Sequence, residues 1–177
     1  EIKPGFVYKN PNVTVTAFPT KHAMDSYGYR FETADRSIVI SGDTNPTQAT
    51  VDACNGCDVL IHEVLTHDWL SRRPDFVNYA ATFHTTTSQL AELATKARPR
   101  LLILYHASIA WRPVVDNQRS RPEVLLSEII SKYSGHVVVG RDLERRVPHE
   151  AVTDPLGRTV RLVGPHLDVA ELPAALF

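Results

Sequence analysis

Apolar and polar positions alternate in two short runs near the start of the chain. Residues 13–18 alternate β-branched and small side chains, and residues 27–32 place Tyr27, Tyr29 and Phe31 at every second position. A period of two is typical of strands with one buried face. We therefore predict two strands over Val13–Phe18 and Tyr27–Glu32 that form an opening antiparallel hairpin.

Three later runs are almost continuously apolar instead of alternating. They cover Ser37–Ile40, Asp58–Ile61 and Leu101–Leu104. Such runs indicate strands that are covered on both faces. Helical patterns over Thr47–Ala53 and Thr86–Ala97 precede the second and third run, and the latter segment has its apolar residues on one stripe.

A third helix is predicted over Pro122–Tyr133, because proline suits the first helical position and Gly135 suits a C-terminal cap. The run His136–Gly140 then predicts another strand. Strands that alternate with helices favour an α/β layer structure. The pattern weakens after residue 146, and Pro148–Phe177 is expected to form a hairpin or tail.

Composition narrows the class of protein and of partner. The chain has 177 residues, 43% of them apolar and 22% charged, with a net charge of −1. This predicts one globular domain with no bulk electrostatic attraction for nucleic acid or acidic membranes. The longest apolar stretches have four or five residues, far short of the roughly 20 of a spanning helix, so we expect no membrane partner.

The two cysteines, Cys54 and Cys57, form a single C-x-x-C pair. One pair is too few for a disulfide scaffold, and no second pair completes a structural zinc site. We expect a tight turn with packed thiols. A redox-active pair is the alternative interpretation.

Ionisable residues follow each of the apolar runs. Asp43 follows the first, His62 and Glu63 end the second, and His106 follows the third. In open α/β sheets, the loops at the carboxyl ends of the strands converge on ligand sites. His84 precedes the second helix and His22 lies between the first two strands.

Imidazole and carboxylate groups together suit a divalent metal such as zinc. Each of these residues alone is more typical of a surface turn, a solvated strand end or a satisfied core position. The order of the whole set is what favours a metal site.

That order resembles the metallo-β-lactamase fold, and within it the ribonuclease Z and arylsulfatase-like phosphodiesterase branch. The resemblance runs over residues 5–145 and rests on motifs that include Ser41-Gly42-Asp43-Thr44, Leu60-Ile61-His62-Glu63, His84-Thr85-Thr86 and Leu104-Tyr105-His106. It implies a mixed sheet with helices on its outer face, as in one half of an αββα sandwich.

The resemblance also implies roles for individual residues. His22 would bind one metal ion, His106 the other, and Asp43 would bridge the two. His84 would contact the scissile group or protonate the leaving group, with Glu63 as the carboxylate that orients it. The expected reaction is hydrolysis by a water activated at a dinuclear centre, with two zinc ions, or manganese or iron in their place.

One departure concerns completeness. The family's His-x-His-x-Asp-His signature is not present in this sequence. We therefore expect residues 1–146 to be the C-terminal portion of the domain, and the N-terminal half, on the same gene product or a second chain, to be a required partner. A non-catalytic half-domain that serves as a structural or assembly partner is the main alternative.

A second departure concerns the substrate. Only 20 residues separate His22 from Asp43, which leaves no room for the long tRNA-gripping insertion of ribonuclease Z enzymes. The expected substrate is a small phosphodiester, sulfate ester or lactone, and nucleic acid is not the expected partner. The segment Leu65–Ala81 is expected to be a loop that rims the site, and Trp111 to reach the pocket or the core. Relatives that dimerise make a homodimer a further expectation.

Overall fold

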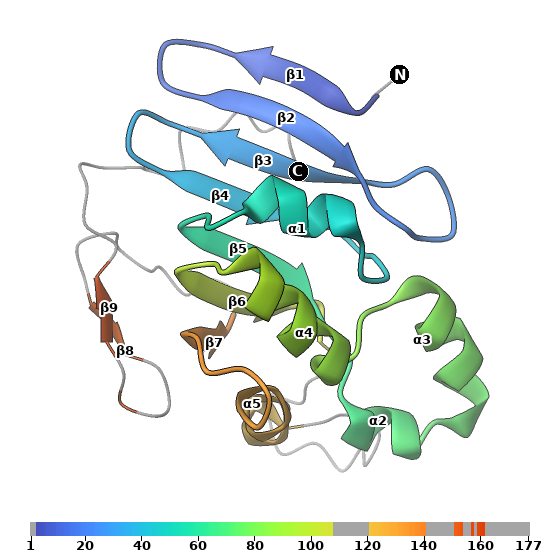
Figure 1. Ribbon diagram of the computed structural model, residues 1–177. Coiled ribbons are helices and arrows are strands. Elements are labelled where there is room, and N and C mark those ends of the chain that lie inside the picture. Colours follow the sequence, from blue (N-terminus) through green and yellow to red (C-terminus); the bar gives the residue numbers. More distant parts are fainter. Residues whose placement is uncertain (1–2, 108–120, 141–150, 154–156, 158, 162–177) are drawn as a thin grey trace.

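A seven-stranded mixed sheet forms the body of the protein (Figure 1). The computed structural model describes residues 3–107, 121–140, 151–153, 157 and 159–161. The strands lie in chain order across the sheet: β1 (Gly5–Lys9), β2 (Thr14–Pro19), β3 (Tyr27–Glu32), β4 (Ser37–Ile40), β5 (Val59–Glu63), β6 (Leu101–Tyr105) and β7 (Val137–Val139). β1 to β4 pair antiparallel, and β4 to β7 pair parallel.

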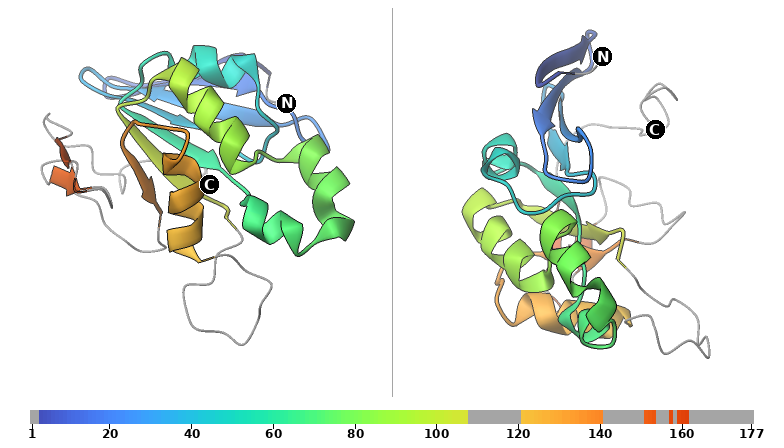
Figure 2. Two further views of the ribbon diagram at one scale, coloured as in Figure 1. Left: turned by 60° about the horizontal axis from the view of Figure 1, so that its bottom comes forward. Right: turned by 90° about the vertical axis from the view of Figure 1, so that its right-hand side faces the viewer.

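Three helices cover one face of this sheet: α1 (Gln48–Cys54), α4 (Thr87–Ala97) and α5 (Pro122–Ile130). The right-hand view of Figure 2 shows all three on the same side of the strands. Leu90 of α4 and Ile129 of α5 are fully buried in one cluster with Leu60 and Leu102 of the sheet. A capping box at Thr86 fixes the start of α4. The predicted α/β fold with a mixed sheet and helices on one face is confirmed.

The opposite face of the sheet is also apolar. The strand register aligns Tyr29, Ile40, Ile61, Ile103 and Val138 in one row across five strands. The first four side chains of this row are only partly buried. In a β-sandwich the inner face of each sheet is apolar because the second sheet packs on it. The row therefore matches the inner face of one half of a two-sheet structure.

Several local predictions need correction. β1 was not expected, because four of its five residues are exposed and give no alternating apolar pattern. The expected loop over Leu65–Ala81 contains α2 (His67–Ser71), a 3-10 turn η1 (Pro74–Phe76) and the start of α3 (Val77–Phe83). These helices are too short to show a periodic stripe. The helix α5 ends at Ile130, three residues earlier than predicted.

Two short strands lie near the C-terminus. β8 (Ala151–Thr153) and β9 (Thr159–Arg161) pair antiparallel. The proposed division at residue 146 falls outside the described residues, and it stays a prediction. No helix among the described residues is long and apolar enough to cross a bilayer.

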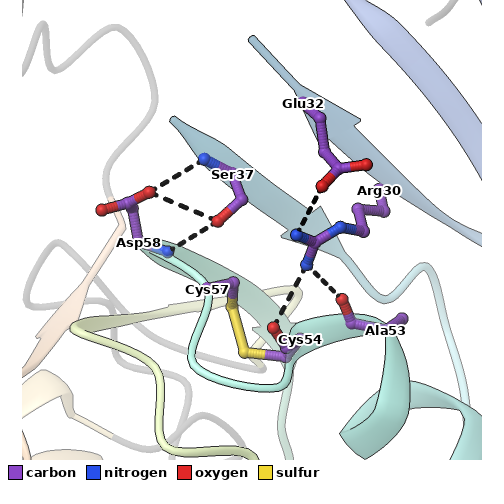
Figure 3. Close-up of a disulfide and its surroundings, with 7 residues drawn as sticks. All are labelled: Arg30, Glu32, Ser37, Ala53, Cys54, Cys57 and Asp58. Carbon is purple, nitrogen blue, oxygen red and sulfur yellow. Dashed lines mark hydrogen bonds and ion pairs between the residues drawn. A yellow bond between two sulfur atoms is a disulfide. The ribbon is translucent and has the colours of Figure 1, made fainter. Parts of the chain in front are cut away.

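Cys54 and Cys57 form a disulfide and are not free thiols, which corrects the expectation of packed thiols (Figure 3). The turn between them has left-handed backbone at Asn55 and Gly56, and both cysteines are buried. This geometry brings the two sulfur atoms together at the end of α1. Arg30 donates to the carbonyl oxygens of Ala53 and Cys54 and so caps that helix end.

Candidate metal and catalytic site

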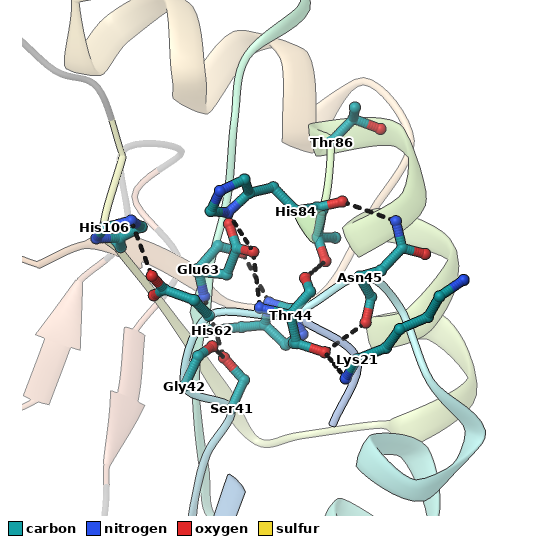
Figure 4. Close-up of polar contacts among 12 residues, drawn as sticks. Lys21, Ser41, Gly42, Thr44, Asn45, His62, Glu63, His84, Thr86 and His106 are labelled. Carbon is teal, nitrogen blue, oxygen red and sulfur yellow. Dashed lines mark hydrogen bonds and ion pairs between the residues drawn. The ribbon is translucent and has the colours of Figure 1, made fainter. Parts of the chain in front are cut away.

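The candidate residues lie at one edge of the sheet, where the parallel strands β4, β5 and β6 end. Asp43 follows β4, Glu63 is the last residue of β5, and His106 follows β6. The strand register places Glu63 beside Tyr105. Figure 4 shows that His84 and Lys21 approach this edge from other parts of the chain. The predicted convergence at the carboxyl ends of the strands is therefore present.

The loop that carries Asp43 is fixed through the next residue, Thr44. The Thr44 amide donates to Glu63 Oε1 at 3.0 Å, and Thr85 Oγ1 donates to the Thr44 carbonyl at 2.6 Å. The Lys21 amide also donates to Thr44 Oγ1 at 3.0 Å. Because Thr44 is fully buried, these contacts hold the loop while the Asp43 side chain stays 36% exposed.

Glu63 and His84 form a buried acid–imidazole pair. His84 Nδ1 lies 3.0 Å from Glu63 Oε1, and the two side chains are 8% and 0% exposed. The hydrogen bond to Glu63, helped by the charges of Glu63 and Asp43, raises the pKa of His84 above its ordinary value. With Nδ1 donating to Glu63, Nε2 of His84 is the nitrogen left for a ligand. Glu63 Oε2 has no hydrogen-bond partner among the described residues.

His106 faces the carboxylate of Asp43. Its Nε2 atom lies 3.3 Å from Asp43 Oδ2, and its side chain is 49% exposed. The backbone of His106 is left-handed, with φ at 49°, which is uncommon for a residue with a Cβ and is concentrated at functional sites. The ring of His106 stacks at 5.9 Å from the ring of His84.

His22 completes the row of imidazoles. A short bridge between Lys21 and Asn45 ties its loop to the segment after Asp43. The ring centroid of His22 lies 5.3 Å from that of His84. Its Nε2 atom is buried and has no hydrogen-bond partner in the described part of the chain. A buried nitrogen without a partner costs free energy, and a ligand bound to Nε2 would remove that cost.

The donor set fits a divalent metal ion. Imidazole nitrogens of His22 and His106 and the carboxylate of Asp43 are the ligand types that zinc accepts. Within the described residues, no group of three or more His, Cys, Asp or Glu side chains is close enough to hold a metal by itself. These residues would therefore need further ligands to form a metal site.

His62 and Glu63 are not solvated strand-end residues, because both are completely buried. His62 points away from the site edge, into the core beneath α4, since its strand partner Leu104 lies in the helix-covered cluster. Its Nδ1 atom contacts the Glu63 carbonyl at 2.7 Å. Burial lowers the pKa of His62 to about 4.

Three further residues lie around the site. Asn45 donates to the carbonyl oxygens of Ala81 and His84 and so holds the His84 segment. Burial and the nearby charge of Asp43 raise the pKa of Tyr105 to about 12, which keeps this neighbour of Ser41 protonated. Tyr79 contacts His84 with its ring. Asn45 directly follows the motif Ser41-Gly42-Asp43-Thr44 and was not predicted. Tyr105 belongs to the quoted motif Leu104-Tyr105-His106, and Tyr79 belongs to the segment Leu65–Ala81 that was expected to rim the site.

The arginines of the segment Leu65–Ala81 are already paired. Arg72 lies 2.6 Å from Asp68, and Arg73 lies 3.1 Å from Asp75. Because both guanidinium groups are paired with carboxylates, this arrangement does not favour anion binding by these two arginines. Trp111, which is predicted to reach the pocket or the core, lies outside the described residues.

Comparisons with known proteins agree with the fold. A family model described as "Beta-lactamase superfamily domain" matches residues 1–107. A ribonuclease Z of Mycobacterium tuberculosis (strain ATCC 25618 / H37Rv) is 28% identical over 152 residues, which cover 84% of this chain and 54% of that protein. A ribonuclease Z of Mycobacterium sp. (strain KMS) is 34% identical over 110 residues, covering 60% of this chain and 38% of that one. The chain thus spans about half the length, or less, of these curated relatives.

Solved structures show the same fold. The metallo-β-lactamase fold protein YhfI from Bacillus subtilis superposes with a TM-score of 0.61 at 20% identity, covering 79% of this chain and 50% of that one. The short form of human tRNase Z gives a TM-score of 0.53 at 22% identity, covering 78% and 44%. The resemblance to ribonuclease Z is confirmed. The family model matches well over half of the residues of this chain, so the chain belongs to the β-lactamase superfamily.

Proposed function

We propose that this chain supplies the C-terminal half of a metal-dependent hydrolase that cleaves a phosphodiester. One observation carries the proposal: the buried Glu63–His84 pair lies beside the Asp43–His106 pair at the same edge of the sheet. The first pair suits proton transfer and the second suits metal binding. The names of the ribonuclease Z relatives favour a phosphodiester over a sulfate ester or a lactone.

His22, Asp43 and His106 are the proposed metal ligands, with Asp43 shared between two ions. Zinc fits the nitrogen and oxygen donors, and manganese and iron are the alternatives. A divalent ion held there would polarise the ester and lower the pKa of an attacking water. Three hydrogen bonds restrain Thr44, the residue after Asp43. The fixed loop would therefore keep the Asp43 carboxylate in place before any ion binds.

His84 is the proposed proton donor to the leaving oxygen. Its Nδ1 atom is engaged by Glu63, so Nε2 is the atom that would carry the proton toward the substrate. The hydrogen bond that His84 donates to Glu63 stabilises the imidazolium form, which is the form an acid needs. A positioned general acid contributes typically 10²–10⁴-fold to a rate.

The N-terminal half of the fold is the proposed partner. It would supply the remaining ligands and cover the apolar row from Tyr29 to Val138. The charge of −1 and the short segment between His22 and Asp43 favour a small phosphodiester. The names ribonuclease Z and tRNase Z conflict in part with the expectation that nucleic acid is not a partner. RNA is therefore the second candidate substrate.

The test uses the chain together with its N-terminal half. Elemental analysis should give about two metal ions per complex, and the complex should hydrolyse bis(p-nitrophenyl) phosphate. The Asp43→Ala variant should lose this activity, whereas the Asp52→Ala variant, which changes an exposed carboxylate on α1, should retain it. A non-catalytic half-domain predicts no hydrolysis and no effect of Asp43→Ala beyond stability. Cleavage of a tRNA precursor, but not of the small ester, would select the RNA candidate.

A further inference from the structure

A row of aromatic rings leads from the candidate site along α2, η1 and α3. The ring of Trp69 lies 5.2 Å from that of Phe76, and the ring of Phe76 lies 4.7 Å from that of Tyr79. Tyr79 in turn lies 5.0 Å from Phe83 and 5.4 Å from His84. Tyr79 is thus one ring away from the imidazole that contacts both His22 and His106.

Tyr79 is the member of this row that is open to solvent. Its surface is 40% exposed, whereas Trp69 is buried at 7%. A large exposed aromatic side chain beside an acid–imidazole pair has area left for a ligand. Since an ester bound between His22 and His106 would place a substituent next to His84, that substituent would also lie next to Tyr79.

The segment that runs from α2 through η1 to α3, and that includes Tyr79, is anchored at both ends. Glu128 of α5 accepts hydrogen bonds from the amides of His67 and Asp68 at the start of α2, each at 2.9 Å. The same carboxylate accepts from Thr87 at 2.6 Å. At the other end, Asn45 donates to the carbonyl of Ala81 in α3 at 2.8 Å. A ring held this way loses little conformational entropy when a ligand stacks on it.

The charges of this segment favour stacking over anion binding. Arg72 and Asp68 pair with each other, and so do Arg73 and Asp75. Arg73 also lies over the rings of Trp69 and Phe76, at 5.5 and 5.4 Å. Both guanidinium groups are thus paired with carboxylates. The surface that this segment presents to a ligand is therefore aromatic.

We infer that Tyr79 is a specificity-determining residue, which stacks on a nucleobase attached to the phosphodiester. The inference rests on the proposed function, because it takes the phosphoester to bind at the His22–His106 row. A nucleobase is the planar ring that phosphodiesters carry close to phosphorus. Base–aromatic stacking tolerates all bases, so Tyr79 selects for the presence of a base and not for its sequence.

The experiment compares two ligands that differ only in the base. The metal-loaded complex of this chain with its N-terminal half is titrated calorimetrically with adenosine 5′-monophosphate and with ribose 5-phosphate. The nucleotide should bind at least about fivefold more tightly. The Tyr79→Leu variant should lose this preference and bind ribose 5-phosphate unchanged, and Tyr79→Phe should keep it.

Two further variants separate stacking from a structural role. Tyr79→Trp enlarges the ring and should strengthen nucleotide binding about twofold or more, so the inference stays testable if Tyr79→Leu folds poorly. Val77→Ala alters another exposed residue of α3 and should change neither affinity. Equal affinities for both ligands in the unmodified protein, equal weakening of both in Tyr79→Leu, or no binding of either ligand would overturn the inference. The proposed function is judged separately, by hydrolysis of bis(p-nitrophenyl) phosphate.

Discussion

The two ends of strand β5 carry carboxylates in opposite circumstances. At the amino end, Asp58 accepts hydrogen bonds from the Ser37 amide and hydroxyl (Figure 3). Asp58 also pairs with Arg100 at 3.0 Å. At the carboxyl end, Glu63 is more deeply buried, yet its Oε2 atom has no partner among the described residues. A buried acceptor without a partner lowers stability.

Histidines show the same contrast. His22 keeps a buried Nε2 atom without a hydrogen-bond partner in the described part of the chain, and His106 has left-handed backbone. The disulfide and the Arg30 cap, in contrast, lie toward the other end of the sheet. The amino end thus contributes stability, and the carboxyl end keeps unsatisfied groups that a ligand would complete.

The largest expected effect comes from exchanging the two carboxylates for amides. Glu63→Gln should lower the turnover of the complete protein by at least about 10²-fold, because His84 loses the charge that favours its imidazolium form. Asp58→Asn should leave turnover unchanged and lower the free energy of unfolding by about 1–2 kcal/mol. Steady-state kinetics and urea unfolding of both variants measure this. Equal turnover in the two variants would contradict a catalytic role that is specific to Glu63.

The next effect concerns pH and His62. Burial lowers the pKa of His62 to about 4 in the folded protein, below the ordinary value of 6.5 for an exposed imidazole, so the unfolded chain binds the proton more readily between these values. The contribution of neutral His62 to the free energy of unfolding should be fully present above pH 6.5. It should fall by about 3 kcal/mol between pH 7 and pH 4.

Urea unfolding at several pH values tests this, with His62→Gln as the variant that cannot titrate. The difference between the two pH curves isolates the imidazole from the carboxylates, which titrate in both proteins. If the free energy of unfolding depended on pH in the same way in both proteins, His62 would not be the cause of the acid sensitivity.

The smallest effect is expected at the disulfide. Replacing Cys54 and Cys57 by alanine opens a loop with a sequence separation of 3, for which chain entropy predicts a loss of about 2 kcal/mol. Thermal unfolding should detect the loss, and hydrolysis should be unchanged because the pair lies away from the site edge. Activity that followed the oxidation state of this pair would instead support the redox interpretation.

Much of the fold could be predicted from periodicity. The strands β2 to β7 and the helices α1, α4 and α5 fall where alternation, apolar runs and caps placed them, within a few residues. The elements that were missed are β1, α2 and α3, which are short or mostly exposed. Local pattern carries little signal for such elements, because their conformation depends on neighbours that lie far along the chain.

The sequence by itself determined the strand order along the chain, the residue types at the strand ends and the resemblance to the superfamily. Only the tertiary structure decided which groups meet. Glu63 reaches His84 and Thr44, which are 21 and 19 positions away. Asn45 reaches Ala81, and Glu128 reaches His67. These contacts depend on strand register and helix packing, which sum many weak interactions across the sheet, and no single stretch of sequence encodes them.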